Sequence, residues 1–260
     1  MIKKFLFAVY LIFICLISFS QSDSSLFFVQ ITDTHIGKYD HFKRTEKIIK
    51  SINELPFNIQ FVVHTGDIFQ NNILNDLVCD SVKHLFSQLK VPVFFVPGNH
   101  DILENQFKDC YNKYIKQIGY TDTVIVIDNT AFMFLYTGPL EDSENILYKS
   151  QLKKIDSLFN SYKNQNKIIF HHIPSVSDFY NNKIHQGWDS LSFNRWKSML
   201  KKNNVTAVIA GHFHRDELHW IDNIPVYVSS SVAGFWGRQA SYRIYEYKNN
   251  KLTYRTVYIY

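Results

Sequence analysis

Cysteine is scarce in this chain, and so are the stretches rich in glycine, proline or serine that join domains. Of its 260 residues, three are cysteine, nine glycine and six proline. Beyond residue 20 only Cys79 and Cys110 remain, so at most one disulfide is available, and two buried thiols are an equally common outcome. We find no internal repeat, low-complexity tract or flexible linker, and therefore expect one domain over residues 21–260.

A strong charge of one sign is also missing. The formal net charge is +5, and 26 basic residues oppose 23 acidic ones once Lys3 and Lys4 are left out. This excess is too small to indicate nucleic acid binding, so no nucleic acid polymer is expected as a partner. With 46% hydrophobic residues, the chain can bury a full core.

The first 20 residues contain a long apolar run. MIKK precedes FLFAVYLIFICLISFS, which ends in the small residues Ser18 and Ser20. This layout is typical of a secretory signal peptide, so we expect cleavage, export to the periplasm or the extracellular medium, and no stable membrane span afterwards. An uncleaved N-terminal membrane anchor is the alternative. Cys15 lacks the preceding small residues that a lipid-attachment site would need.

Beyond this segment, short apolar runs alternate with longer amphipathic ones, which is the pattern of βαβ units and predicts an α/β fold. The predicted strands cover residues 26–32, 59–65, 91–97, 123–128, 131–137, 167–172 and 205–211. The predicted helices cover 42–54, 73–90, 103–118, 147–162 and 190–202. After residue 216, short strands separated by Asn, Asp and Gly turns predict antiparallel pairing.

Polar residues follow the carboxyl ends of five of these strands, where open α/β sheets place their ligand sites. The five blocks are Thr32-Asp33-Thr34-His35, His64-Thr65-Gly66-Asp67, Pro97-Gly98-Asn99-His100-Asp101, Phe170-His171-His172-Ile173-Pro174 and Ala210-Gly211-His212-Phe213-His214. Each block alone has an ordinary structural explanation, such as a core histidine, a Gly-Asp turn or a helix cap. Five such blocks in this order instead indicate a metal site.

The donor types define the kind of site. Histidine, aspartate and asparagine without thiolates suit Mn, Fe, Zn or Co, and do not make a structural zinc site. Six or seven ligands exceed the needs of one ion, so we expect two metal ions, which together activate water and bind phosphoryl oxygens. The chain lacks a Gly-x-Ser-x-Gly elbow, a Walker-type phosphate loop and a His-Glu-x-x-His motif, so it offers no competing nucleophile.

Together these blocks resemble the signature of the calcineurin-like metallophosphoesterases. The resemblance runs from Asp33-x-His35 to Gly211-His212-x-His214 and implies a four-layer αββα sandwich of mixed sheets with a dimetal site at the strand ends. It implies that Asp67 bridges the two ions. The remaining ligands that it implies are Asp33, His35 and His214 for one ion, and Asn99, His172 and His212 for the other.

The same resemblance assigns the catalytic roles. Of the adjacent histidines, His172 is taken as the ligand because it precedes Pro174 by two residues, as in His-x-Pro segments of the family, which leaves His171 for support or substrate contact. His100 is expected to protonate the leaving oxygen or to donate a hydrogen bond to the phosphoryl oxygens, with Asp101 holding its other ring nitrogen. The expected reaction is in-line attack of a metal-bridging hydroxide on a phosphate mono- or diester, without a phosphoenzyme.

The residues after Asp67 narrow the resemblance. Gln70 stands where purple acid phosphatases have an iron-binding tyrosine, so a ferric-tyrosinate enzyme is disfavoured. Gly66-Asp67-Ile68-Phe69-Gln70-Asn71 is more similar to the bacterial class III cyclic-nucleotide phosphodiesterases. Asn71 departs from that branch, which commonly has an acidic residue nearby.

Two aromatic loops are candidate substrate contacts. Residues 175–188 carry Phe179, Tyr180, His185 and Trp188, and residues 233–238 carry Trp236 and Arg238. They either stack on an organic group while Arg238 contacts phosphate, or pack together as a minor core. The expected partner is a small organic phosphate ester. A lipid-linked or pyrophosphate substrate, or a non-catalytic binding protein on the same fold, are the alternatives.

Overall fold

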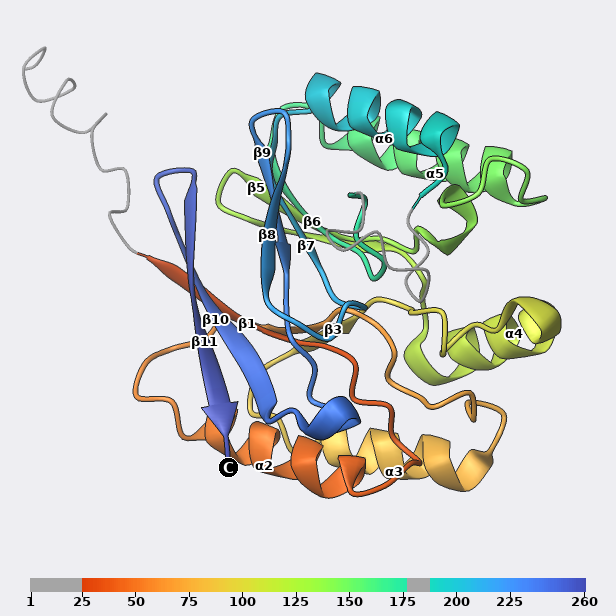
Figure 1. Cartoon of the computed structure of the whole chain (residues 1–260). Coiled ribbons are helices and arrows are strands. Elements are labelled where there is room, and N and C mark those ends of the chain that lie inside the picture. Colours follow the sequence, from red (N-terminus) through yellow and green to blue (C-terminus); the bar gives the residue numbers. More distant parts are fainter. Residues whose placement is uncertain (1–24, 177–187) are drawn as a thin grey trace, which may run out of the picture.

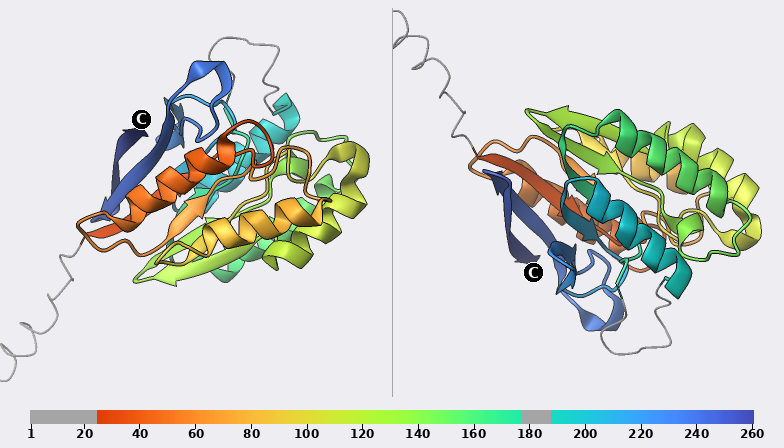
Figure 2. Two further views of the ribbon diagram at one scale, coloured as in Figure 1. Left: turned by 90° about the horizontal axis from the view of Figure 1, so that it is seen from below. Right: turned by 90° about the horizontal axis from the view of Figure 1, so that it is seen from above.

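The computed structural model of the protein describes residues 25–176 and 188–260. These residues form two mixed β-sheets packed face to face, with helices on both outer sides (Figure 1). Figure 2 shows the same layers from below and from above. The α/β class and the four-layer αββα sandwich predicted from the sequence are therefore confirmed.

The first sheet has the strand order β11-β10-β1-β2-β3. Its strands are β1 (Leu26–Ile31), β2 (Val62–His64), β3 (Val93–Phe95), β10 (Ala240–Lys248) and β11 (Lys251–Ile259). The first three are parallel, and β10 and β11 add antiparallel strands beside β1. The associated helices are α2 (His41–Asn53), α3 (Asp76–Phe86) and α4 (Phe107–Ile118), which follows a short 3₁₀ turn, Glu104–Gln106.

The second sheet has the order β4-β5-β6-β7-β9-β8. Its strands are β4 (Thr123–Ile127), β5 (Thr130–Phe134), β6 (Asn166–Phe170), β7 (Val205–Ala210), β8 (Glu217–Ile221) and β9 (Ile224–Val228). Its outer face is covered by α5 (Tyr148–Ser161) and α6 (Ser190–Lys202) (Figure 1). Strands β5, β6, β7 and β9 are parallel, so their carboxyl ends share one edge with those of the first sheet.

The carboxyl-terminal strands pair as two hairpins, and the hairpins join different sheets. Strands β8 and β9 pair antiparallel through Asp222, and β10 and β11 pair through Asn249 and Asn250, all three of which have positive φ. Asn and Asp tolerate this conformation, which matches hairpin turns to the strand twist. The expectation of antiparallel pairing therefore holds within each hairpin, whereas β9 pairs parallel with β7.

Three buried clusters correspond to the three interfaces of the sandwich. One lies between the first sheet and its helices, and a second lies between the other sheet and α5 and α6. The third joins the two sheets and is rich in aromatic rings, including Phe28, Phe61 and Phe170. Full burial of one such side chain is worth about 1.5–3 kcal/mol, so this interface fixes the two sheets relative to each other.

Two further expectations concern the cysteines and the membrane. Cys79 and Cys110 are both buried and free, so the disulfide left open by the sequence is not formed. In residues 25–176 and 188–260, we find no helix of the length and hydrophobicity that crossing a membrane requires. The proposed signal peptide lies outside the described residues.

Candidate metal centre

The five sequence blocks meet at one edge of the sandwich because their loops continue the sheet pairing beyond the strand ends. The backbone N–H of Asp33 donates to Gly66 O (3.0 Å), and that of His35 donates to Asp67 O (3.0 Å). On the other sheet, Gly211 N donates to His172 O (3.0 Å). The loops are thus held at fixed register, and their side chains project into a shared space.

The backbone of these loops is strained in a way that ordinary turns are not. Non-glycine residues seldom adopt positive φ, and such conformations cluster at functional sites because surrounding structure must stabilise them. Five of the expected ligands have a positive φ, namely Asp33 (53°), His35 (44°), Asp67 (56°), His212 (70°) and His214 (55°). The strain turns successive side chains toward the same point.

The first donor group contains Asp33, His35 and His214. Asp33 Oδ1 lies 3.2 Å from His214 Nε2, and the Nε2 atoms of His35 and His214 are 3.3 Å apart. All three residues are buried, and Asp33 Oδ1 has no hydrogen-bond donor. Burial lowers the pKa of His35 to about 4, which leaves its imidazole neutral and able to donate a lone pair.

The second donor group is built around His172. Its Nε2 lies 3.1 Å from both Asp67 Oδ2 and Asn99 Oδ1, and its ring centroid is 5.1 Å from that of His212. His172 Nδ1 donates to the carbonyl of Thr65 (2.7 Å), which fixes the ring and aims Nε2 into the site. His212 is held through its backbone N–H, which donates to Asp33 Oδ2 (3.0 Å).

Asp67 lies between the two groups. Its Oδ2 is 3.6 Å from His35 Nε2 as well as 3.1 Å from His172 Nε2. Burial alone would raise the pKa of Asp67, but His172 and then His35 hold it well below its usual range. Asp67 is therefore ionised, and its carboxylate can bind a cation.

These residues fit metal ions. Asp33 with His35 and His214, and Asp67 with His172 and His212, each place three donor atoms within 4.8 Å of one another. Imidazole and carboxylate donors suit Mn, Fe, Zn or Co, and the buried Asp33 Oδ1 without a donor needs a positive partner. Two ions would be held by these groups, with Asn99 Oδ1 available to the second and Asp67 to both.

The glycines of the blocks make room for ligands from other blocks. A β-carbon added to Gly66 would lie 2.5 Å from His172 Nδ1. One added to Gly98 would lie 2.9 Å from Asp67 Cγ, and one added to Gly211 would lie 2.8 Å from Asp33 Oδ2. Each distance is shorter than real β-carbons allow. The Gly-Asp, Gly-Asn and Gly-His pairs of the sequence are therefore packing requirements as well as turns.

The orientation of His100 differs from expectation. Its Nδ1 lies 2.6 Å from Asn71 Oδ1, and its Nε2 lies 4.0 Å from Asp67 Oδ2. Asp101 instead accepts hydrogen bonds from the backbone N–H groups of Phe69 (2.9 Å) and Gly98 (2.8 Å). The assignment of Asp101 as the partner of the His100 ring was wrong, because its carboxylate turns inward to hold the loops, and Asn71 takes that position.

His171 and Trp188 belong to the core. Successive residues at the end of a strand point to opposite faces, so His172 faces the donor groups while His171 faces α6. His171 is fully buried, with its ring 5.9 Å from those of both Trp188 and Trp196. Trp188 also donates to the carbonyl of Ile173 (3.3 Å). The assignment of His171 as a substrate contact was wrong, because its ring is buried on the far side of the sheet. Trp188 is partly buried against the core of the second sheet, and its suggested role in substrate contact stays a prediction.

Trp236 and Arg238 lie beside the first donor group. Trp236 is 66% exposed, and its ring centroid is 5.4 Å from that of His214. Arg238 donates to the carbonyl of His214 and stacks on Trp236 at 5.5 Å. Their suggested role in substrate contact stays a prediction. Phe179, Tyr180 and His185 lie outside the described residues.

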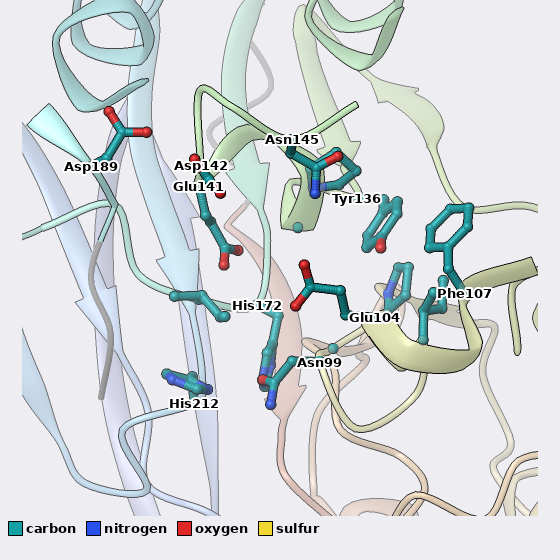
Figure 3. A pocket seen from close by; sticks show the side chains of 16 residues that line it. Asn99, Glu104, Phe107, Tyr136, Glu141, Asp142, Asn145, His172, Asp189 and His212 are labelled. Atoms are coloured by element: carbon teal, nitrogen blue, oxygen red, sulfur yellow. The ribbon is translucent and has the colours of Figure 1, made fainter. Parts of the chain in front are cut away.

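A cavity of about 810 Å³ opens beside the second donor group (Figure 3). Its wall includes Asn99, His172 and His212 together with Glu104, Phe107, Tyr136 and Glu141, which our sequence reasoning missed. Glu104 and Glu141 follow strand ends as the five blocks do, so position was the available signal. Glu104 stands three residues after Asp101 of the third block, whereas Glu141 lies in a loop without the His and Gly-Asp pattern that made the five blocks recognisable.

Two sheets with buried imidazole and carboxylate donors at their carboxyl edge define a metal-dependent hydrolase site. The model of the calcineurin-like phosphoesterase family matches residues 28–216, which is more than half of the chain. The chain belongs to the calcineurin-like phosphoesterase family, and is therefore a metallophosphoesterase that hydrolyses phosphoric ester bonds.

Similar proteins agree with this assignment. A probable cyclic nucleotide phosphodiesterase of Colwellia psychrerythraea is 24% identical over 211 residues, covering 76% of this chain and 74% of that protein. A probable glycerophosphodiester phosphodiesterase of Arcobacter nitrofigilis is 27% identical over 203 residues, covering 72% and 71%. The structure of a dimetal phosphatase from Danio rerio has a TM-score of 0.63 at 14% identity, covering 90% of this chain and 98% of that one. That last likeness concerns the fold.

Proposed function

We propose that the protein is an exported, dimetal-dependent phosphoesterase that hydrolyses small organic phosphate mono- or diesters. The observation that carries the proposal is the position of Asp67, whose Oδ2 lies 3.1 Å from His172 Nε2 in one donor group and 3.6 Å from His35 Nε2 in the other. A single carboxylate between two sets of imidazoles suits a pair of ions. The relatives named as phosphodiesterases support a diester.

When bound, two such ions supply an activated water at neutral pH and neutralise the phosphoryl oxygens. The protein orients the reaction around them. His100 is 32% exposed, so its ring reaches the solvent-facing side of the site, where the leaving oxygen would lie. With Nδ1 held by Asn71, Nε2 is the nitrogen that faces the site. We propose that it delivers a proton to the leaving oxygen during in-line displacement.

Export is part of the proposal because of the first 20 residues. Their two lysines, apolar run and terminal small residues support a cleaved signal peptide. Mass spectrometry of protein from a producing cell would test this, since cleavage near residue 20 shortens the chain, whereas an anchor leaves it intact.

The test of the activity uses mature protein stripped of metal and then supplied with Mn, Zn, Fe or Co in turn. Hydrolysis of bis(4-nitrophenyl) phosphate and of 4-nitrophenyl phosphate separates diester from monoester preference. Asp67→Asn should reduce both metal content and turnover. Asp128→Asn, in the exposed β4–β5 turn where asparagine also accepts positive φ, is the matched control and should behave as wild type.

Each outcome has a distinct meaning. Turnover that requires metal and is lost in Asp67→Asn supports the dimetal esterase. Active Asp67→Asn protein without metal contradicts it. Two ions bound per chain with no turnover of either ester would instead favour a binding role or the pyrophosphate and lipid-linked substrates.

A further inference from the structure

Gln30 is a polar residue in the aromatic layer between the two sheets. It lies in β1 on the same face as Phe28, which belongs to that layer, and it is fully buried. Burial of an amide is unfavourable unless its hydrogen bonds are made within the protein. The partners of the Gln30 amide therefore explain why a polar side chain occupies this position.

The Gln30 amide joins two of the blocks that carry metal ligands. Its Nε2 donates to Thr65 Oγ1 (2.8 Å) in the second block and to the carbonyl of Ala210 (2.9 Å) in the fifth. Thr65 follows β2 of the first sheet, and Ala210 ends β7 of the second, so one amide spans the sandwich. Gln30 itself stands three residues before Asp33 of the first block. Three blocks are thus held at one point.

Both contacts of Gln30 Nε2 lead to imidazoles of the second donor group. The carbonyl of Thr65 accepts from His172 Nδ1 (2.7 Å), so a shift of Thr65 would turn the ring whose Nε2 faces the metal site. Ala210 is separated from His212 by one residue. Loss of the two contacts would therefore allow His172 and His212 to move relative to each other.

The direction of the Gln30 amide is set by a buried arginine. Arg243 pairs with Gln30 across β1 and β10, and it donates to Asp216 Oδ1 (2.8 Å) and to Tyr245 Oη (3.4 Å). A guanidinium accepts no hydrogen bond, so the Tyr245 hydroxyl directs its own proton to Gln30 Oε1, which is 3.0 Å away. Burial raises the pKa of Tyr245 to about 12, so the hydroxyl keeps this proton at neutral pH. Nε2 is then left to face the two ligand blocks.

We propose that Gln30, oriented by Tyr245 and Arg243, is a positioning residue for the second metal ion. It acts through Thr65 and Ala210 and does not itself touch the metal. The aromatic layer holds the two sheets together, but apolar contacts are not directional, so hydrogen bonds are needed to set the ligand blocks at a fixed register. This inference rests on the dimetal function proposed above.

The test compares Gln30→Met with a matched control, Thr130→Val. Gln30→Met keeps an unbranched side chain but cannot donate to either block. Thr130 Oγ1 donates to Tyr247 Oη (3.1 Å), which is also a buried hydrogen bond between the two sheets. Thr130 begins β5, so this bond lies at the edge opposite the metal centre. The control therefore removes an inter-sheet contact without reaching the ligand blocks.

Calorimetric titration of metal-stripped protein with Mn measures the two binding steps, and His212→Ala identifies the step that belongs to the second donor group. In Gln30→Met we expect this step to weaken about tenfold, as loss of a supporting contact at a metal site does. In Thr130→Val it should stay unchanged. The visible absorption of cobalt-loaded protein reports the arrangement of the donor atoms, and it should shift in Gln30→Met but not in Thr130→Val.

Tyr245→Phe is a milder variant that tests the same idea if Gln30→Met does not fold. It leaves Gln30 Oε1 without its donor, and it should weaken the same binding step, with no further loss when combined with Gln30→Met. Wild-type affinity and absorption in the Gln30 and Tyr245 variants, or an equal loss in Thr130→Val, overturns the positioning role while leaving the dimetal function intact. Wild-type protein that binds fewer than two metal ions overturns both.

Discussion

Gly98 packs directly against the carboxylate of Asp67. A β-carbon at Gly98 would overlap Oδ1 and the backbone nitrogen of Asp67 and would lie 2.9 Å from its Cγ. Asp67 cannot retreat, because its Oδ1 accepts the His100 N–H (2.8 Å) and its Oδ2 faces His172. The third sequence block thus sets the position of the carboxylate supplied by the second.

Gly98→Ala should therefore displace Asp67 and weaken metal binding by about 10–100-fold, as loss of a supporting contact at a metal site does. Calorimetric titration of metal-stripped protein with Mn or Zn measures this. Gly119→Ala is the control, since Gly119 has a φ of 95° but open space around it. It should lower stability by about 1 kcal/mol through backbone strain and leave metal affinity unchanged. Unaltered affinity in Gly98→Ala would contradict the packing argument.

Asn71 should matter for turnover through His100. Its Oδ1 accepts from His100 Nδ1 (2.6 Å), so Asn71→Ala leaves the ring free to rotate away from the site. In Asn71→Ala we expect kcat to fall about tenfold with metal content unchanged. In His100→Ala we expect kcat to fall further, by roughly 10²–10⁴-fold. Asn71→Asp retains an acceptor and should restore most of the Asn71→Ala loss. A double variant, Asn71→Ala with His100→Ala, should be no slower than His100→Ala alone if Asn71 acts through His100.

His171 should contribute to stability and not to substrate binding. It is fully buried against Trp188 and Trp196, so His171→Ala leaves a cavity and should lower the free energy of unfolding by about 2–4 kcal/mol. KM should change by less than about threefold. Urea unfolding and steady-state kinetics on the same preparation check both values. A large increase in KM with unchanged stability would contradict this prediction and would indicate that His171 contacts the substrate.

The sequence was most informative where backbone geometry and chemistry coincide. Alternation of apolar runs predicted the strands, and the blocks after them predicted which side chains meet, because parallel strands deliver their carboxyl ends to one edge. The sequence pattern did not distinguish Asn71 from Asp101 as the hydrogen-bond partner of the His100 ring. That choice depends on the loop after Asp67, where Asn71 adopts a φ of 58° and turns toward the third block. No local pattern in the sequence specifies that turn.

The cavity wall was missed for a related reason. Glu104 and Glu141 are 37 residues apart and lie in the connections after β3 and β5, which belong to different sheets, so they share a surface only once the two sheets are packed. His171 illustrates the opposite error. Its neighbour His172 is a strong ligand candidate, and only the side of the sheet on which each ring lies separates the two roles.

Acid should destabilise the metal-stripped protein partly through His64. Its Nδ1 accepts the Gly66 N–H (3.2 Å), while its Nε2 lies 3.0 Å from Thr34 Oγ1, whose own proton goes to the carbonyl of Ile68 (3.1 Å). This arrangement requires the neutral ring with the proton on Nε2. Burial lowers the pKa of His64 to about 3, against about 6.5 in the unfolded chain.

Between these values the unfolded chain binds one more proton at this position than the folded chain does. Stability from His64 is therefore complete above about pH 6.5 and declines as the pH falls toward 3, by up to about 1.4 kcal/mol per pH unit. Urea unfolding at pH 7, 6 and 5 should show a shallower decline in His64→Gln than in wild type. Exposed His84→Gln should keep the wild-type slope. If His64→Gln keeps that slope as well, His64 is already protonated in the folded protein and the hydrogen-bond assignment fails.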